Sequence, residues 1–136
     1  MIIVDAGVLI AATDVDDDHH EACSRLFAER GSEFIVPATV VVEVCWMLAG
    51  HVSTAVEAEF LDSIAEGELR VEILDRVDYA RASELVTIYG DFPLGMVDAS
   101  VVAMAERLNI SEVATLDHRH FNVVRPQHVE SFTLLP

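Results

Sequence analysis

Four acidic side chains of this 136-residue chain occupy positions where an acidic residue has no ordinary surface role. Asp5 and Asp117 each follow a short apolar stretch, IIV and VATL, of the kind that forms a buried strand. Glu43 lies inside the apolar segment VVVEVCWML, and Asp98 begins the segment VDASVVAMAERLN. Magnesium and manganese ions prefer oxygen ligands, so these residues predict a divalent-cation site able to hydrolyse phosphodiester bonds.

Asp98 is placed by helical spacing. On a helix expected over residues 97–109, Asp98 shares one face with Val101, Val102 and Ala105, at i, i+3, i+4 and i+7. This spacing puts the carboxylate at the N-terminal edge of the inward face. Capping of the first helical turn is the alternative role for this residue.

The other three acids also have structural alternatives. Glu43 lies in a helix that is apolar on nearly every side, so its carboxylate must be protonated, bound to a cation or paired with an arginine in the core. Asp5 and Asp117 can each cap the residues that follow them. If their strands are neighbours in a parallel sheet, however, both side chains point into the same crevice.

The elements that must position these residues alternate along the chain. Short apolar strands alternate with longer helices, which predicts a parallel sheet covered by helices on both faces. We therefore expect one three-layer α/β/α domain over residues 1–136, with a mostly parallel sheet of four to five strands. Strands are expected at 2–4, 34–36, 71–74 and 112–116, with short further strands possible at 122–124 and 131–134. Helices are expected at 7–12, 19–30, 38–49, 53–66, 77–89 and 97–109, with Ser53 as an N-cap and Gly31, Gly50 and Gly67 as terminators.

The charge balance bears on the partner. The chain has 24 acidic and 8 basic residues, a net charge of −16, and all of its basic residues are arginines. This argues against an extended nucleic-acid interface, because affinity for phosphate depends largely on Lys and Arg. Bound divalent ions can nevertheless invert the field of an acidic cluster, and a short arginine strip suffices for a small contact. The acidic surface also suits an arginine-bearing protein partner.

The cellular setting follows from what the sequence lacks. Two cysteines at no ligand spacing indicate buried thiols in a reducing compartment. No apolar run reaches the roughly 20 residues of a membrane span, and no basic segment precedes the first apolar run. We therefore expect a soluble, cytoplasmic protein with no membrane association.

Taken in order, the motifs resemble those of the PIN-domain family, and within it the VapC toxins of bacterial toxin–antitoxin pairs. IIVDAGVLIAA resembles the first strand with its metal-binding Asp5, and VPATVVVEVCWML places Glu43 as the family's helical glutamate. PLGMVDASVVAMAERL places Asp98 at the third acidic position. VATLDHRHFNVVRP places Asp117 at the fourth, with Thr115 matching a polar residue two positions earlier. The resemblance spans nearly the whole chain.

The resemblance implies a PIN-like fold and a function. It implies an endoribonuclease toxin that inhibits translation by hydrolysing structured RNA, a tRNA or a ribosomal RNA loop, leaving a 5′-phosphate and a 3′-hydroxyl. The cofactor would be Mg²⁺, with Mn²⁺ as a substitute, held by Asp5, Asp98 and Asp117, while Glu43 completes the catalytic set. It also implies a VapB-like antitoxin whose C-terminal arm fills the active-site groove, often with an arginine against the carboxylates, and a homodimer.

Two departures from the family pattern affect the site. Ala6 and Gly7 replace residues that commonly carry side-chain oxygens, and His120 replaces an acid near the fourth position. Both leave fewer ligands for a second metal, so one firmly held ion is expected. Our hypothesis is that Thr115 and the basic run at the mouth of the site contact RNA; that run consists of His118, Arg119 and His120. The alternative is a loop whose basic character has no role.

Other acidic-pocket families fit less well. A response-regulator receiver needs a lysine, which this chain lacks, and a haloacid dehalogenase-type phosphatase needs a second Asp where Gly7 stands. No phosphate-binding or dinucleotide-binding glycine motif occurs. Zinc sites from Cys23 with His19 and His20, or from His118 with His120, lack a full tetrahedral set. A catalytically silent PIN-like module that binds RNA or protein stays open as the second function.

Overall fold

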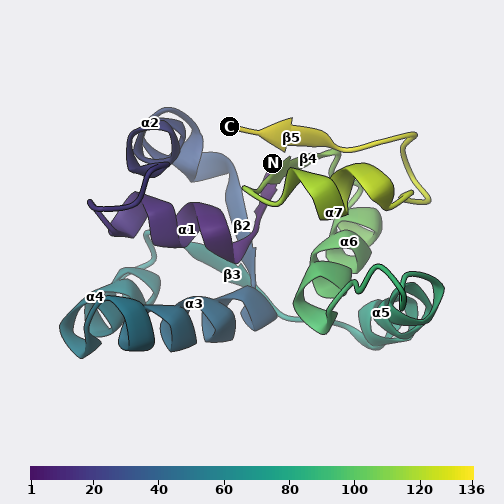
Figure 1. Cartoon of the computed structure of the whole chain (residues 1–136), viewed down its shortest axis with the longest axis horizontal. Coiled ribbons are helices and arrows are strands. Elements are labelled where there is room, and N and C mark those ends of the chain that lie inside the picture. The colour runs from purple at the N-terminus through teal and green to yellow at the C-terminus, as the bar shows by residue number, and fades with distance from the viewer.

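A computed structural model describes all residues, 1–136, as an α/β fold built on one five-stranded sheet. The strand order is β3-β2-β1-β4-β5, and every neighbouring pair is parallel (Figure 1). The expectation of a mostly parallel sheet is therefore confirmed, with all five strands parallel. The strands are β1 (Ile2–Val4), β2 (Phe34–Pro37), β3 (Arg70–Glu72), β4 (Glu112–Ala114) and β5 (Thr133–Leu135).

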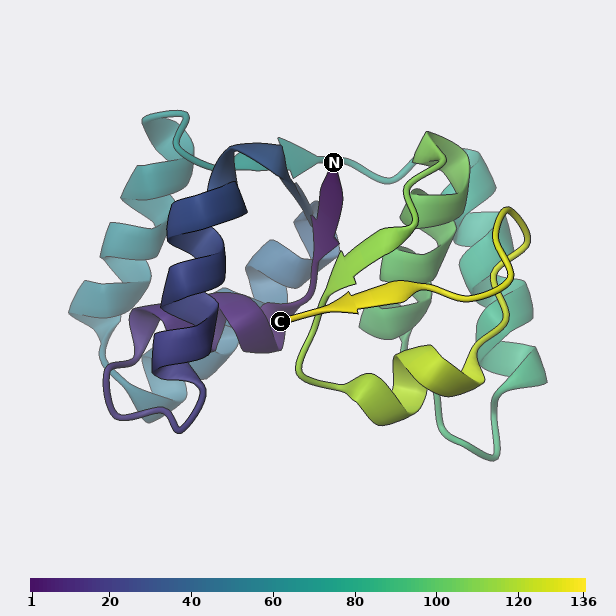
Figure 2. The same ribbon diagram turned by 90° about the horizontal axis from the view of Figure 1, so that it is seen from above.

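Seven α-helices flank this sheet. In Figure 2, α1, α2 and α4 lie to one side of the strands and α5, α6 and α7 to the other. Helix α3 packs against α1 and α4 and also contacts α6. The bounds are α1 (Ala6–Thr13), α2 (His20–Arg30), α3 (Ala38–His51), α4 (Thr54–Ala65), α5 (Arg76–Ile88), α6 (Met96–Leu108) and α7 (His118–Val123), and a short 3-10 turn (Gly31–Glu33) follows α2. No helix combines the length and apolar character needed to span a membrane.

The core lies around the central strands. All three residues of β1 are completely buried, and β2 is buried along its whole length. Strands covered on both faces consist of continuous apolar runs rather than alternating ones, which explains the sequences IIV and FIV. Helix α6 is buried continuously from Ala99 to Ala105. The carboxyl end of β1 and the first turn of α6 therefore border this core.

Helix ends were predicted with mixed success. Ser53 caps α4, since its hydroxyl accepts the N–H of Val56 at 3.1 Å. Gly67 has a φ of +82° and follows α4 as expected. Gly31 directly follows the last residue of α2, Arg30, as expected, and with a right-handed φ of −58° it continues into the 3-10 turn. The prediction for Gly50 is wrong, because this residue lies inside α3. Neither glycine adopts the left-handed conformation that commonly follows a helix.

The predicted strand at 122–124 is wrong, because residues 118–123 form α7. The Asp117 carboxylate accepts the N–H of His120 at 3.1 Å and so starts the helix. This local cap outweighs the strand preference of the two valines at its end. The basic run predicted as a loop is consequently the first turn of α7.

Candidate active site

Asp5 and Asp117 follow two neighbouring strands of the sheet. Strands β1 and β4 pair in parallel, with Val4 opposite Ala114, and the Asp5 N–H donates to the Ala114 carbonyl at 2.9 Å. The strand order reverses between β1 and β4, because β2 and β3 lie on the far side of β1. Ligands of open parallel sheets bind at such a reversal, beyond the carboxyl ends of the strands.

Asp5 is fixed at both carboxylate oxygens. Oδ1 accepts the N–H of Ala6 at 2.8 Å and caps α1, and Oδ2 accepts the hydroxyl of Thr115 at 2.9 Å. The residue is only 7% exposed. Burial raises the pKa of Asp5, against the lowering effect of these two hydrogen bonds. Asp5 therefore caps α1, and its charge also raises the pKa of Asp98 and of Glu43.

Thr115 joins the two aspartates. Its hydroxyl donates to Asp5 and accepts the N–H of Asp117 at 3.0 Å. The side chain is completely buried, which gives Thr115 a positioning role rather than a solvent-facing one. The threonine therefore fixes the end of β1 against the turn after β4.

Asp98 projects from the first turn of α6 toward the same point. Its Oδ2 lies 3.4 Å from His120 Nδ1, and that nitrogen also contacts the Asp117 carboxylate. One potential ligand atom from each of Asp98, Asp117 and His120 lies within 4.8 Å of the others. Burial, followed by the negative charge of Asp5, raises the pKa of Asp98 to about 7.

Glu43 approaches from α3. Burial, together with the charge of Asp5, raises its pKa, and no arginine pairs with it. The reason given for its inward position was wrong, because α3 has a solvent-facing side on which Trp46 is 75% exposed. One turn earlier on the same helix, the hydroxyls of Thr39 and Ser100 are 2.6 Å apart and join α3 to α6, the helix that bears Asp98.

The first turn of α7 meets a residue that the motifs did not indicate. The Phe92 ring lies edge-on to the His120 imidazole, with 4.8 Å between ring centroids, and the Arg119 guanidinium lies over the Phe92 ring at 5.3 Å. Both His118 and Arg119 are exposed. Phe92 is in the segment between α5 and α6, and no motif in the sequence indicates it.

The acidic cluster at the carboxyl ends of neighbouring parallel strands matches a known family. A model of the PIN domain matches residues 2–125. The chain belongs to the PIN-domain family.

Relatives of this PIN domain include a VapC protein and toxin structures. The chain is 30% identical over 135 residues to Ribonuclease VapC26 of Mycobacterium tuberculosis, covering 99% of this chain and 100% of the relative. Its fold is similar to that of M. tuberculosis VapC20, described as a sarcin-ricin loop cleaving toxin, with a TM-score of 0.77, 19% identity and coverage of 83% and 87%. It is also similar to a chain of a toxin–antitoxin complex from Klebsiella pneumoniae, with a TM-score of 0.71, 14% identity and coverage of 95% and 100%.

The donor set of this PIN domain fits a divalent ion. Asp98 and Asp117 offer carboxylate oxygens and His120 an imidazole nitrogen, and no arginine neutralises the two acids. Asp5 lies outside this closest group, with each of its oxygens already accepting one hydrogen bond. A carboxylate oxygen has a second lone pair, so Asp5 retains capacity for a ligand.

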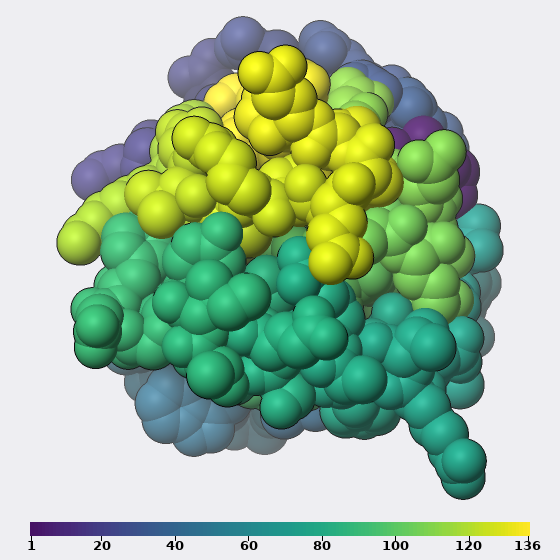
Figure 3. All heavy atoms as spheres, turned by 90° about the vertical axis from the view of Figure 1, so that its right-hand side faces the viewer, coloured from purple at the N-terminus to yellow at the C-terminus, as the bar shows by residue number.

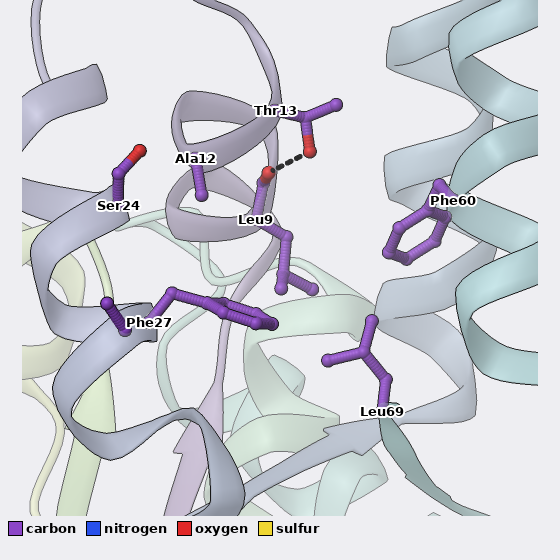
Figure 4. A pocket seen from close by; sticks show the side chains of 8 residues that line it. Leu9, Ala12, Thr13, Ser24, Phe27, Phe60 and Leu69 are labelled. Carbon is purple, nitrogen blue, oxygen red and sulfur yellow. Dashed lines mark hydrogen bonds between the residues drawn. The ribbon is translucent and has the colours of Figure 1, made fainter. Parts of the chain in front are cut away.

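A second hollow of the molecule has no such chemistry. A cavity of about 340 Å³ lies between α1, α2 and α4, and in Figure 4 the side chains of Leu9, Phe27, Phe60 and Leu69 converge on it. The Thr13 hydroxyl at its rim donates to the Leu9 carbonyl at 2.7 Å. No titratable side chain lines this cavity, so catalysis has to be sought at the acidic cluster.

Proposed function

We propose that this PIN domain, spanning residues 1–136, is a VapC-type toxin that cuts RNA with the help of Mg²⁺ or Mn²⁺. The observation that carries the proposal is the group of Asp98, Asp117 and His120 beside Asp5, in which Asp98 has a pKa of about 7 and no arginine counter-ion. Such an accumulation of negative charge is stabilised by a bound cation. The 30% identity to a VapC ribonuclease over the whole chain supports the same function.

Each residue has a role in the proposed hydrolysis. Asp5, Asp98 and Asp117 would hold the ion, which supplies Lewis acidity toward the scissile phosphate. Glu43 has no partner and a raised pKa, so it is suited to accept the proton of the attacking water. The water oxygen would bond to phosphorus as the bond to the 3′-oxygen breaks, and the 3′-oxygen would take a proton from solvent water. This leaves a 5′-phosphate and a 3′-hydroxyl.

The substrate we propose is structured RNA, a tRNA or a ribosomal RNA loop, whose cleavage inhibits translation. His118 and Arg119 are exposed on the first turn of α7, next to the acidic cluster, which supports a contact of these residues with phosphate. His120 contacts the carboxylate of Asp98, and Thr115 hydrogen-bonds to both Asp5 and Asp117. A relative's described activity on the sarcin-ricin loop supports a ribosomal target as one of the two classes.

We further propose a VapB-like antitoxin, a homodimeric toxin and a cytoplasmic setting. A similar chain was solved in a toxin–antitoxin complex. The net charge of −16 favours a partner with basic residues, and an arginine placed against Asp98 and Asp117 would supply the cation that these acids lack. An antitoxin bound in this way would compete directly with metal and RNA.

The alternative is a module that binds RNA or protein without cutting. The contact of His120 with both Asp98 and Asp117 favours it, because the imidazole gives both acids a partner without a metal. Ala6 and Gly7, which carry no side-chain oxygen, point the same way.

Cleavage of cellular RNA separates these functions. Partner-free protein is incubated with total RNA in the presence of Mn²⁺, Mg²⁺ or EDTA, beside the variants Asp5→Ala and Asp98→Asn. Asp62→Asn, on the exposed side of α4, is the matched control for charge. Metal-dependent cleavage by wild type and Asp62→Asn alone supports the nuclease, with sequencing of the ends showing 5′-phosphates. Equal cleavage by all variants, or cleavage in EDTA, contradicts the mechanism, and RNA binding without cleavage supports the module.

A further inference from the structure

The segment between α5 and α6 places an aromatic ring beside the acidic cluster. The N–H groups of Phe92 and Leu94 both donate to the Tyr89 carbonyl at 3.1 Å, which closes the segment into a tight turn. Leu94 is the core anchor of this turn, at 4% exposure, whereas Phe92 is only partly buried. Leu94 already attaches the turn to the core, so the partly buried Phe92 ring is not needed for that purpose.

The Phe92 ring contacts Arg119, an arginine that makes no ion pair. Of the eight arginines, five contact carboxylates: Arg25, Arg30, Arg70, Arg81 and Arg107. Two of the other three, Arg119 and Arg125, lie in α7 or just after it. In Figure 3 the surface of α5 and the turn after it directly adjoins that of α7 and the residues that follow. Two of the three arginines without an ion pair thus lie in or just after α7, the helix that bears His120.

The order of contacts is Arg119, Phe92, His120 and then the carboxylates. The exposed Arg119 guanidinium lies 5.3 Å from the Phe92 ring centroid, and the ring meets the His120 imidazole edge-on at an interplanar angle of 84°. His120 in turn contacts Asp98 and Asp117. A group lying on Arg119 is therefore held at a defined distance from the carboxylates.

We propose that Phe92 and Arg119 form a stacking platform for an unpaired nucleobase of the RNA, next to the phosphate that is cut. Unpaired bases stack on aromatic rings and on guanidinium planes, and a guanidinium supported by a ring serves both the base and the phosphate. This inference rests on the proposed function for the identity of the ligand as RNA. It assigns to Phe92 the positioning of the substrate and excludes a fully paired helix from the cut site.

A double-mutant cycle between protein and RNA tests the platform. The probe is a fluorescein-labelled single-stranded RNA, in an intact form and in forms lacking one base at successive positions. Binding is measured by anisotropy with Ca²⁺ in place of Mg²⁺, so that an oxygen-binding divalent ion is present at the carboxylates. The variants are Phe92→Leu, which keeps apolar volume without a ring face, Phe92→Trp, which keeps the face, and Arg119→Ala. Arg76→Ala, an unpaired arginine at the start of α5, controls for loss of charge.

The platform predicts that Phe92→Leu and Arg119→Ala each weaken binding of intact RNA about tenfold or more, the effect of losing one stacked base. Both losses should disappear on the RNA that lacks one particular base, while Phe92→Trp retains affinity. Four results overturn the proposal: no binding of intact RNA by wild type, no loss in Phe92→Leu, an equal loss in Arg76→Ala, or losses that persist at every abasic position. Thermal melting of each variant shows whether it is folded. If Phe92→Leu is unfolded, the binding by Phe92→Trp and Arg119→Ala tests the platform instead.

The same proteins separate this inference from the proposed function. Metal-dependent cleavage by wild type together with normal RNA binding by Phe92→Leu overturns only the platform. Absence of cleavage by wild type, together with the binding losses that the platform predicts, overturns only the nuclease.

Discussion

Buried acids occur in two regions of this PIN domain, and only one region neutralises them. Between α5 and α6, Asp78 is 1% exposed and its carboxylate accepts two hydrogen bonds from Arg107 Nε, at 3.0 and 2.9 Å. Nearby, Arg81 holds Glu106 in the same way, at 2.9 Å. At the ends of β1 and β4, by contrast, Asp5 and Asp98 face other carboxylates and one imidazole. Burial alone therefore does not mark a site; burial without a counter-cation does.

The largest loss of stability is expected when the ion pair between Arg107 and Asp78 is broken. Arg107→Ala leaves Asp78 buried without its partner, which typically costs about 3–5 kcal/mol of unfolding free energy. Denaturant unfolding of the metal-free protein measures the loss. RNA cleavage per folded molecule should stay close to wild type, because neither residue belongs to the acidic cluster. A loss smaller than that of an exposed control such as Arg25→Ala would show that the pair has no structural role.

In the acidic cluster, by contrast, removing a carboxylate should increase the stability of the metal-free protein. In the metal-free protein the pKa of Asp98 is about 7, against an ordinary value of 3.8. The stability contributed by the protonated form is complete below pH 3.8 and is lost as the pH rises to about 7, by up to about 4 kcal/mol. Asp98→Asn removes this cost, so the variant should be more stable than wild type at pH 8. Chemical unfolding at pH 5 and pH 8 measures the difference, and a variant less stable than wild type at pH 8 would contradict it.

Metal should restore the stability that charge repulsion removes. A ligand present at 100 times its dissociation constant stabilises the native state by about 2.7 kcal/mol. At pH 8, Mn²⁺ should therefore raise the melting temperature of wild type and leave that of Asp98→Asn nearly unchanged. Arg107→Ala should retain the full shift, because its defect lies in the other region. Equal shifts in wild type and Asp98→Asn would place the ion elsewhere.

The smallest effect on stability is expected at the hydroxyl that joins Asp5 to Asp117. Thr115→Val keeps the shape of the side chain and removes both hydrogen bonds, which should cost about 1–3 kcal/mol. Because the two aspartates lose their common link, cleavage should fall about 10- to 100-fold, as for other residues that orient metal ligands. Thr115→Ser, which keeps the hydroxyl, should recover most of the activity; failure of this rescue would mean that Thr115 acts through packing.

The sequence predicts the positions of strand-end residues well, because that prediction depends only on pattern. Parallel strands that alternate with helices bring Asp5 and Asp117 to one edge, and helical spacing brings Asp98 toward the core. The argument for Glu43 was weaker. The apolar residues of α3 were taken to be buried all round, yet Val42 is 70% exposed, so composition could not identify which side faces the cluster.

Contacts between distant segments were beyond prediction. The pairing of Arg107 with Asp78 and the position of Phe92 against Arg119 depend on how α5 and the turn after it pack against α6 and α7. A short strand was expected at 122–124 and no helix at 118–123, and only the cap at Asp117 reveals the helix. That helix is what brings His120 to the carboxylates.

The central claim is that the unneutralised carboxylates at the ends of β1 and β4 bind a divalent cation. Electron paramagnetic resonance of Mn²⁺ titrated into the purified protein at pH 8 tests it directly, because free and bound Mn²⁺ are counted separately. One tightly bound ion per chain is predicted for wild type and for Arg107→Ala, and none for Asp98→Asn. Binding that is equally strong in Asp98→Asn, or undetectable in wild type, would contradict the account.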